Sequence, residues 1–307
     1  MITAVCMNPA FDKTVTVDAL QPGRVNRISR GCVDASGKGV NVAIVAQRLG
    51  LKARCIGCAG EVGAERFLRM LDGQGIEHRF LTVPGELRTN LKVVHLDGSG
   101  VTELNEPGAP VEGERLQAFL RMAQDTCLDT TLMVVNGSLP QGCPEGTYRD
   151  LMRAVNVPCI LDVSGRELLL GLEAKPFLIK PNIHELEATL GRRLNGMAEI
   201  SAAAREMTAL GAQNVLVSMG GDGAMLITRD AGYFAPVIPV AVKSTVGAGD
   251  SMVGGFLKGW VASGGDLKEA FRWSVAAATA AVMTEGTQLV IPEDVTALVE
   301  RVVIQEV

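Results

Sequence analysis

The chain has 307 residues, of which 47% are hydrophobic, and this length suits one large α/β domain or two small ones. The hydrophobic content is ample for a sizeable core, which excludes an intrinsically disordered chain. A net charge of −5 and a pI near 5.4 argue against nucleic acid or an anionic membrane as the main partner.

The cysteines and the N-terminus indicate a cytoplasmic protein. Seven cysteines without a disulfide-like spacing are typical of a reduced compartment. Residues 1–5 predict a strand rather than a signal peptide, and no run reaches the roughly 18 apolar residues of a membrane span. Cys55 and Cys58 form a C-x-x-C inside an apolar run with no companion pair, so we expect buried structural thiols.

The first third of the chain departs from a plain alternation of strands and helices. Residues 2–12 predict a strand followed by a turn that exposes Asp12. Residues 13–30 include a half-exposed strand and a polar return that carries Arg27, and residues 88–105 form a second excursion of the same kind. We expect these two excursions to build a small antiparallel β lid over a cleft.

Residues 35–49 predict a helix that begins at Gly37-Lys38-Gly39. A Walker A motif is rejected, because five residues rather than four separate Gly31 from Gly37 and because Gly39 replaces the required Ser or Thr. A lysine beside two glycines at a helix start suits a phosphate or a sugar hydroxyl. A solvated lysine at the helix start is the ordinary alternative.

The rest of the chain alternates between strand-type and helix-type runs, which predicts a mostly parallel sheet covered by helices on both faces. The expected strands are 53–59, 132–135, 159–163, 177–179 and 215–218, and the expected helices are 63–71, 112–126, 145–155, 184–190 and 200–210. The strands from residue 132 onward end in Gly, Ser, Asn or Lys, at the edge where open α/β sheets bind ligands. Met252 stands where the third glycine of G-x-G-x-x-G belongs, which argues against a dinucleotide oxidoreductase.

The segment Gly247-Ala248-Gly249-Asp250 lies between an apolar β-type run at 237–242 and a helix-type run at 252–261. Its glycines permit a sharp turn, and the helix that follows presents unpaired N–H groups that favour an anion. A carboxylate there can take a proton from a hydroxyl while the N–H groups hold a phosphoryl group. Helix capping by Asp250 is the alternative interpretation.

Six segments, in order along nearly the whole chain, resemble the ribokinase/PfkB family of sugar kinases. They are Asn8-Pro9-Ala10-Phe11-Asp12, residues 37–43, Gly137-Ser138-Leu139-Pro140, Lys180-Pro181-Asn182-x-x-Glu185, residues 217–224 and residues 244–255. The chain departs from the family pattern at Ser36, where many members have glycine, and at Val163, where threonine is frequent. The Gly-Ser-Leu-Pro segment and Arg88-Thr89-Asn90-Leu91-Lys92 are most similar to the branch of 1-phosphofructokinase and tagatose-6-phosphate kinase.

The resemblance implies a ribokinase-like three-layer αβα core in one domain over residues 1–307, with the β lid. It implies Asp250 as the catalytic base and the amides of Gly247, Ala248 and Gly249 as the anion hole. The substrate-binding residues that it implies are Asp12, Gly37, Lys38, Gly39, Asn41, Arg88, Ser138 and, from the lid, Arg27. The nucleotide-binding residues that it implies are Lys180, Asn182, Glu185, Ser218, Gly220, Gly223, Thr245, Ser274 and Ala278. Asn182 and Glu185 are also expected to organise Mg²⁺ through water.

The function that this resemblance implies is ATP-dependent phosphorylation of fructose 1-phosphate to fructose 1,6-bisphosphate. Tagatose-6-phosphate kinase and a 6-phosphofructokinase of the same family stay open, as does a catalytically silent sugar-phosphate sensor. The expected cofactors are ATP and Mg²⁺, and K⁺ is a further candidate. Because two short excursions cannot easily bury an apolar face alone, we expect a homodimer through the lid sheets.

Overall fold

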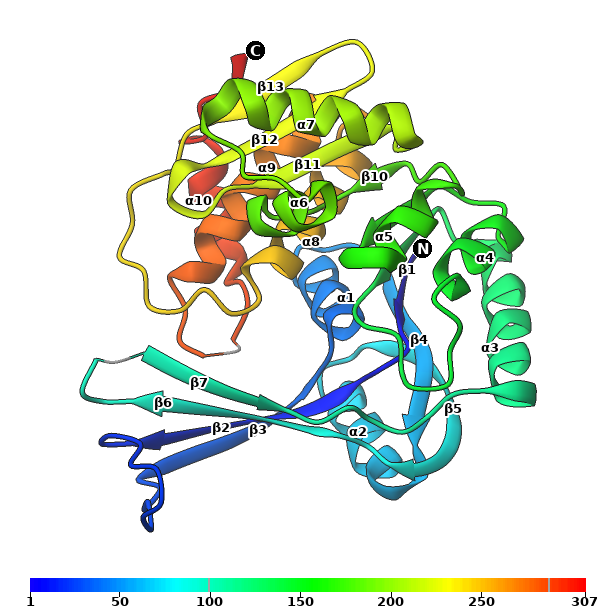
Figure 1. Ribbon diagram of the computed structural model, residues 1–307, viewed down its shortest axis with the longest axis vertical. Coiled ribbons are helices and arrows are strands. Elements are labelled where there is room, and N and C mark those ends of the chain that lie inside the picture. Colours follow the sequence, from blue (N-terminus) through cyan, green and yellow to red (C-terminus); the bar gives the residue numbers. More distant parts are fainter. Residues whose placement is uncertain (99, 287) are drawn as a thin grey trace.

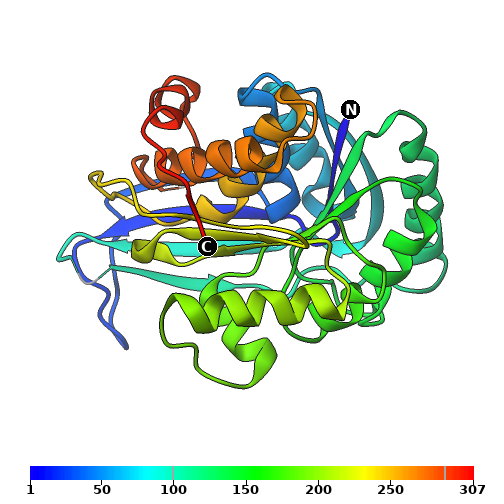
Figure 2. The same ribbon diagram turned by 90° about the horizontal axis from the view of Figure 1, so that it is seen from above.

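The computed structural model describes residues 1–98, 100–286 and 288–307 and has three layers (Figures 1 and 2). A ten-stranded sheet lies between two layers of helices, and a separate four-stranded sheet projects from this core. The predicted fold class, a mostly parallel α/β core with a small β lid, is therefore confirmed.

The large sheet is parallel over most of its width and antiparallel at one edge. In spatial order its strands are β14 (Gln305–Glu306), β13 (Gly232–Ala235), β12 (Ala224–Thr228), β11 (Asn214–Ser218), β10 (Leu178–Ile179), β9 (Cys159–Asp162), β8 (Leu132–Asn136), β1 (Ile2–Cys6), β4 (Ala53–Gly60) and β5 (Glu77–Glu86). The pairings from β5 to β11 are parallel, and those from β11 to β14 are antiparallel.

Alternate side chains of the central strands enter two separate apolar cores, one on each face of the sheet. In β1, for example, Ala4 belongs to one core and Val5 to the other. The helices of the first face are α1 (Lys38–Arg48), α2 (Glu61–Gly73), α8 (Ala248–Ala262), α9 (Leu267–Val282) and α10 (Pro292–Val299). Those of the second face are α3 (Gly113–Thr126), α4 (Thr147–Ala154), α5 (Gly165–Leu172), α6 (Ile183–Leu190) and α7 (Gly196–Leu210).

The four-stranded sheet, called the lid sheet below, is built from both predicted excursions. Its strands, in spatial order, are β3 (Arg30–Ser36), β2 (Ala10–Val17), β6 (Thr89–His95) and β7 (Gly100–Asn105). The expectation of a purely antiparallel lid was wrong, because β2 and β6 pair in parallel. β2 belongs to the first excursion and β6 to the second, and these two neighbouring strands run in the same direction.

Two further sequence-based expectations were wrong. Residues 237–242 form no strand: Pro236 and Pro239 lie on either side of Val237, and prolines cannot donate to a β ladder. Val237 and Val242 are consequently exposed. Asp12 is not exposed in a turn either, because β2 begins at Ala10 and buries the Asp12 carboxylate within the lid sheet.

The cysteines confirm the structural interpretation of the C-x-x-C segment. All seven are free thiols, and both Cys55 and Cys58 are buried in β4. Over the three described ranges, no helix combines the length and apolarity needed to cross a bilayer.

Candidate active site

The glycine turn before α8 has the geometry that an anion site needs. Gly247 lies in the left-handed region at φ 76°, and α8 begins at the next residue. Among the described residues no side chain caps this helix, and although Ala248 N donates to Thr245 O at 3.4 Å, the N–H groups of Gly249 and Asp250 stay available to an external acceptor. The alternative interpretation of Asp250 as a helix cap therefore has no support in the structure.

Asp250 is a buried carboxylate held by a residue of a different helix. Its side chain is 7% exposed, and Asn41 Nδ2 of α1 donates to its Oδ2 at 2.7 Å. Burial raises the pKa of Asp250 to about 6, and the negative charge of Asp162 adds to this rise while Lys38 opposes it. A carboxylate whose pKa lies this close to neutrality is suited to general-base chemistry at physiological pH.

A second carboxylate, Asp162 at the end of β9, bridges two lysines. Lys38 Nζ lies 3.4 Å and Lys180 Nζ 3.2 Å from Asp162 Oδ1. Burial alone would raise the pKa of Asp162, but the two ammonium groups outweigh burial and hold the pKa below its usual range. The pKa of Lys38 is raised because Asp162, Asp250 and Glu185 outweigh its own desolvation.

Lys180 also connects this cluster to the glycine turn. A Cβ placed on Gly249 would lie 3.4 Å from Lys180 Nζ, so the ammonium group is next to the first turn of α8. Asp162 was not among the predicted site residues. Its signal in the sequence was an acid at the end of an apolar strand, between two lysines that were both predicted.

The lid sheet contributes a buried polar cluster around Asp12. Asn90 Nδ2 donates to Asp12 Oδ1 at 2.9 Å, and Lys92 Nζ forms an ion pair with Asp12 Oδ2. All three side chains share one face of the sheet, because Asp12 pairs with Asn90 and Thr14 with Lys92. Asn90 and Lys92 are additional candidates, which the sequence offered only as part of the Arg88–Lys92 resemblance.

Arg88 is tied to backbone carbonyls rather than left free. Its guanidinium donates to Asn8 O at 2.8 Å and to Glu106 O at 3.1 Å, and so joins the chain before β2 to the chain after β7. Asn8 Nδ2 in turn donates to Ser138 Oγ at 3.3 Å. The structure therefore brings Arg88 and Ser138 together through their shared contact with Asn8.

Asn182 and Glu185 form a complete capping box at the start of α6. Asn182 Oδ1 accepts from Glu185 N at 2.9 Å, and Glu185 Oε2 accepts from Asn182 N at 2.8 Å. Asn182 also bridges to Ser218 at the end of β11, where the turn through Gly220 and Gly223 follows. The predicted nucleotide residues of these two strand ends thus lie side by side.

Among the described residues, no hydrogen bond or ion pair joins Ser274 or Arg27 to the clusters described above. Ser274 is fully buried within α9, so its hydroxyl cannot contact a nucleotide in this conformation, although Ala278 one turn later is partly exposed. Arg27 lies on the exposed connection between β2 and β3, which extends from the lid sheet away from the core helices (Figure 1). Thr245 is exposed just before the glycine turn.

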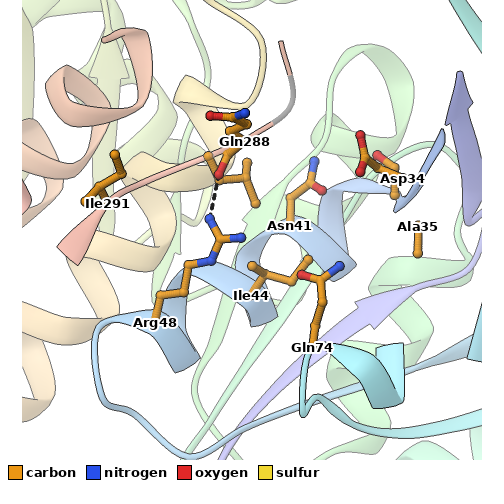
Figure 3. Close-up of a pocket in the computed structure, with 10 residues that line it drawn as sticks. Asp34, Ala35, Asn41, Ile44, Arg48, Gln74, Gln288 and Ile291 are labelled. Carbon is orange, nitrogen blue, oxygen red and sulfur yellow. Dashed lines mark hydrogen bonds between the residues drawn. The ribbon is translucent and has the colours of Figure 1, made fainter. Parts of the chain in front are cut away.

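A pocket of about 420 Å³ opens beside Asn41 (Figure 3). Asn41, Ile44 and Arg48 of α1 line one side of it, and Gln288 and Leu289 from the segment after α9 are also among the lining residues. No group of three or more His, Cys, Asp or Glu side chains suited to a metal ion occurs among the described residues.

Comparison with known proteins identifies several relatives. Residues 6–294 match the model of a family described as pfkB family carbohydrate kinase. The chain is 36% identical over 288 residues to the 1-phosphofructokinase of Bacillus subtilis, with 93% of each chain covered. Further 1-phosphofructokinases match at 34 to 37% identity.

Solved structures extend these similarities to the fold. Phosphofructokinase-2 from Escherichia coli in complex with potassium superposes with a TM-score of 0.91 at 28% identity, with 98% of each chain covered. The same protein has been solved with fructose-6-phosphate and as a tetrameric inhibited form. A ribokinase from Thermotoga maritima superposes with a TM-score of 0.81 at 22% identity over 98% of this chain and 99% of that one, which confirms the ribokinase-like fold.

Proposed function

The chain belongs to the pfkB family of carbohydrate kinases, and from this premise we propose that it is an ATP-dependent kinase that converts fructose 1-phosphate to fructose 1,6-bisphosphate. The observation that most directly supports this proposal is the buried Asp250 carboxylate in the first turn of α8, a helix whose N-terminus has no side-chain cap among the described residues. Its pKa of about 6 leaves it largely ionised near neutral pH and ready to accept a proton. The choice of sugar is supported by the 1-phosphofructokinase relatives, which match over most of their length.

In the proposed reaction Asp250 accepts the proton of the free primary hydroxyl as that oxygen attacks the γ-phosphorus of ATP, while the bond from this phosphorus to the β,γ-bridging oxygen breaks and ADP leaves. The N–H groups from Gly247 to Gly249 stabilise the charge that develops on the transferring group, and the nearby Lys180 ammonium adds positive charge. Asn41 holds the base in position through its bond to Asp250 Oδ2. These residues supply orientation and charge, which are the main protein contributions to phosphoryl transfer.

The residues at the strand ends fit a Mg²⁺ ion that is held chiefly through water and through the nucleotide. Asp162 Oδ2 is buried without a hydrogen-bond partner among the described residues, whereas Asn182 Oδ1 and Glu185 Oε2 are occupied by the capping box. We propose that Asp162 and the remaining carboxylate oxygen of Glu185 face the hydrated ion, with Asn182 positioning Glu185. When bound, Mg²⁺ neutralises part of the charge on the ATP phosphates.

For the acceptor we propose that Asp12, Lys38 and Ser138 bind sugar hydroxyls or the substrate phosphate. Gly37 and Gly39 let the start of α1 pack directly against β1 and the chain after it, because an added Cβ would meet those segments, and we propose that this close approach places the start of α1 beside the sugar. Arg88 is proposed to hold the phosphate, because a guanidinium has five N–H donors and keeps some to spare after bonding the carbonyls of Asn8, Pro9 and Glu106. For the nucleotide we propose Ser218, Gly220, Gly223, Thr245 and Ala278.

We propose that the lid sheet closes over bound sugar and forms a homodimer with a second chain. On the face of the lid sheet that carries Val93, Leu104 pairs with Leu91 and is 57% exposed, which supports an apolar contact between subunits. In that arrangement Arg27 would reach the neighbouring cleft. Val15 and Val17 are not part of this exposed surface, because they are buried against Val93 and Leu20 of the same chain.

Two further proposals concern an activating ion and the cellular location. K⁺ is proposed as an activating ion, with support from the potassium complex of the Escherichia coli relative. A cytoplasmic location is supported by the seven free thiols, which suit a reducing compartment.

A coupled assay of ADP release tests the proposal. Fructose 1-phosphate should give the highest kcat/KM when it is compared with fructose 6-phosphate and tagatose 6-phosphate. A preference for either 6-phosphate would establish the corresponding alternative within the family. Binding of a sugar phosphate without ADP release from any of the three would establish the silent sensor instead.

A further inference from the structure

The segment after α9 makes a close contact with the glycine turn. A Cβ placed on Gly247 would lie 2.6 Å from Leu289 Cδ2, so the Leu289 side chain occupies the space directly beside that turn. Leu289 is 3% exposed and belongs to the core that packs under α8 and α9. The position of Leu289 therefore limits where the backbone of Gly247 can lie.

Leu289 has an unfavourable backbone conformation. Its φ is 58°, and a bulky non-glycine residue in the left-handed region costs free energy that surrounding contacts must offset. One such contact is the bond from Thr284 Oγ1 to Leu289 O at 2.8 Å, which fixes the residue to the end of α9. Strain of this kind persists only where neighbouring groups hold it.

Arg48, the last residue of α1, supplies the other contacts. Its Nη1 donates to Gln288 O at 2.5 Å (Figure 3) and to Val290 O at 3.2 Å, the carbonyls on either side of Leu289. One guanidinium nitrogen thus holds both flanks of the strained residue. Because α1 is a regular helix within the core, this attachment is rigid.

The same face of α1 also holds the base and the helix that carries it. Asn41 donates to Asp250, and Val45 packs where a side chain on Gly254 of α8 would otherwise lie. Asn41, Val45 and Arg48 are spaced i, i+4 and i+7, so they share one face over about 10 Å. A single rigid helix therefore sets the base at one end and the Leu289 contact at the other.

We propose that Arg48 is a positioning residue for phosphoryl transfer, which acts by holding Leu289 against Gly247 and so fixing the anion-binding turn. The inference rests on the proposed kinase function of that turn. Arg48 Nη1 is already bonded to two backbone carbonyls, so in this proposal it does not act by contacting a substrate. It acts on the first-turn N–H groups through two carbonyls and one apolar side chain, and a small displacement of such groups is enough to slow the reaction strongly.

The test compares Arg48→Met, Arg48→Lys and the control Arg153→Met, which removes an arginine of α4 that bonds the Glu173 carbonyl, remote from the turn. Arg48→Met should lower kcat by about 10- to 100-fold, with the KM values for ATP and sugar phosphate changed less than about threefold. Arg48→Lys, which keeps one cationic donor, should recover a large part of kcat. Arg153→Met should resemble the wild type.

Inhibition by MgADP with aluminium fluoride in the presence of sugar phosphate provides a second readout, because this complex mimics the transferring phosphoryl group. Arg48→Met should weaken that inhibition by at least about 10-fold while binding MgADP alone as the wild type does. Unchanged kcat and unchanged aluminium fluoride inhibition in a folded Arg48→Met protein would overturn the inference. A fall in kcat that is matched by a rise in both KM values and by a lower thermal stability would overturn it as well, since these changes together indicate a general structural role. A wild-type protein without kinase activity would instead contradict the proposed function.

Discussion

The bond from Asn41 to Asp250 makes a quantitative prediction about the pH dependence of catalysis. Asn41 Nδ2 donates to the ionised carboxylate at 2.7 Å and therefore favours the charged form and lowers the pKa. A hydrogen bond to a charged group contributes about 1.5–3 kcal/mol, and one pKa unit corresponds to about 1.4 kcal/mol. Solvent reorganisation after the substitution offsets part of the free energy of this hydrogen bond. We therefore expect Asn41→Leu to raise the pKa of Asp250 from about 6 to about 7.

The expected shift can be read directly from kcat/KM. A base of pKa about 6 is half ionised at pH 6, whereas one of pKa about 7 is about 9% ionised, so the variant should lose about fivefold more activity at pH 6 than at pH 8. The assay is ADP release between pH 5 and pH 9, with each profile normalised to its own plateau. This normalisation removes any uniform loss of sugar binding caused by the missing amide.

Asp162→Asn provides a control of opposite sign. The negative charge of Asp162 raises the pKa of Asp250, and its removal also releases Lys38 and Lys180 from their ion pairs. Both effects lower the pKa of Asp250, so the acid limb should move to lower pH. Superimposable limbs for wild type and both variants would refute the assignment of Asp250 as the titrating base.

Four other predictions concern the base, the phosphate site and the lid. Asp250→Asn should lower kcat by about 10²- to 10⁴-fold with MgATP affinity retained in calorimetry. The same variant should be more stable than the wild type at pH 8 by up to about 3 kcal/mol, because the folded pKa of Asp250 lies above its unfolded value and wild-type stability is lost as pH rises from about 4 to about 6. Denaturation midpoints check this: the difference between the two proteins should be small at pH 4 and should grow towards pH 8. Arg88→Ala should raise KM for the sugar phosphate at least about 10-fold and KM for ATP less than about twofold, whereas equal rises would indicate damage to the contacts with Asn8 and Glu106. Leu104→Lys should lower the molar mass measured by light scattering if the lid sheets form a dimer; a wild type that is already monomeric would contradict that arrangement.

The parts of the site that were predictable depend on local sequence. The glycine turn, its carboxylate and the lysine at the start of α1 lie within short segments whose residue types determine backbone conformation and charge. These segments alone therefore place Asp250 and Lys38 at helix starts, and both residues lie in the first turn of their helices.

The parts that were missed depend on contacts between distant residues. Asp162 had only a local signal, an acid at the end of an apolar strand, and its role follows from the fold, which places Lys38 and Lys180 beside it although they are 124 and 18 residues away. The buried state of Asp12 follows from a parallel pairing between two excursions that the sequence suggested would pair antiparallel. The left-handed conformation of Leu289 has no sequence signal at all, because leucine rarely adopts it.

These distant contacts converge on α1, which the sequence presented only as a helix with a glycine-rich start. Lys38 pairs with Asp162, Asn41 bonds to Asp250, and Arg48 holds the segment beside Gly247. The first two contacts change the electrostatics of the base, while the third acts on geometry alone. A substitution at the C-terminal end of α1 should therefore change the rate without moving the acid limb of the pH profile, whereas one at Asn41 should move the limb. This difference separates the two roles of one helix in a single set of measurements.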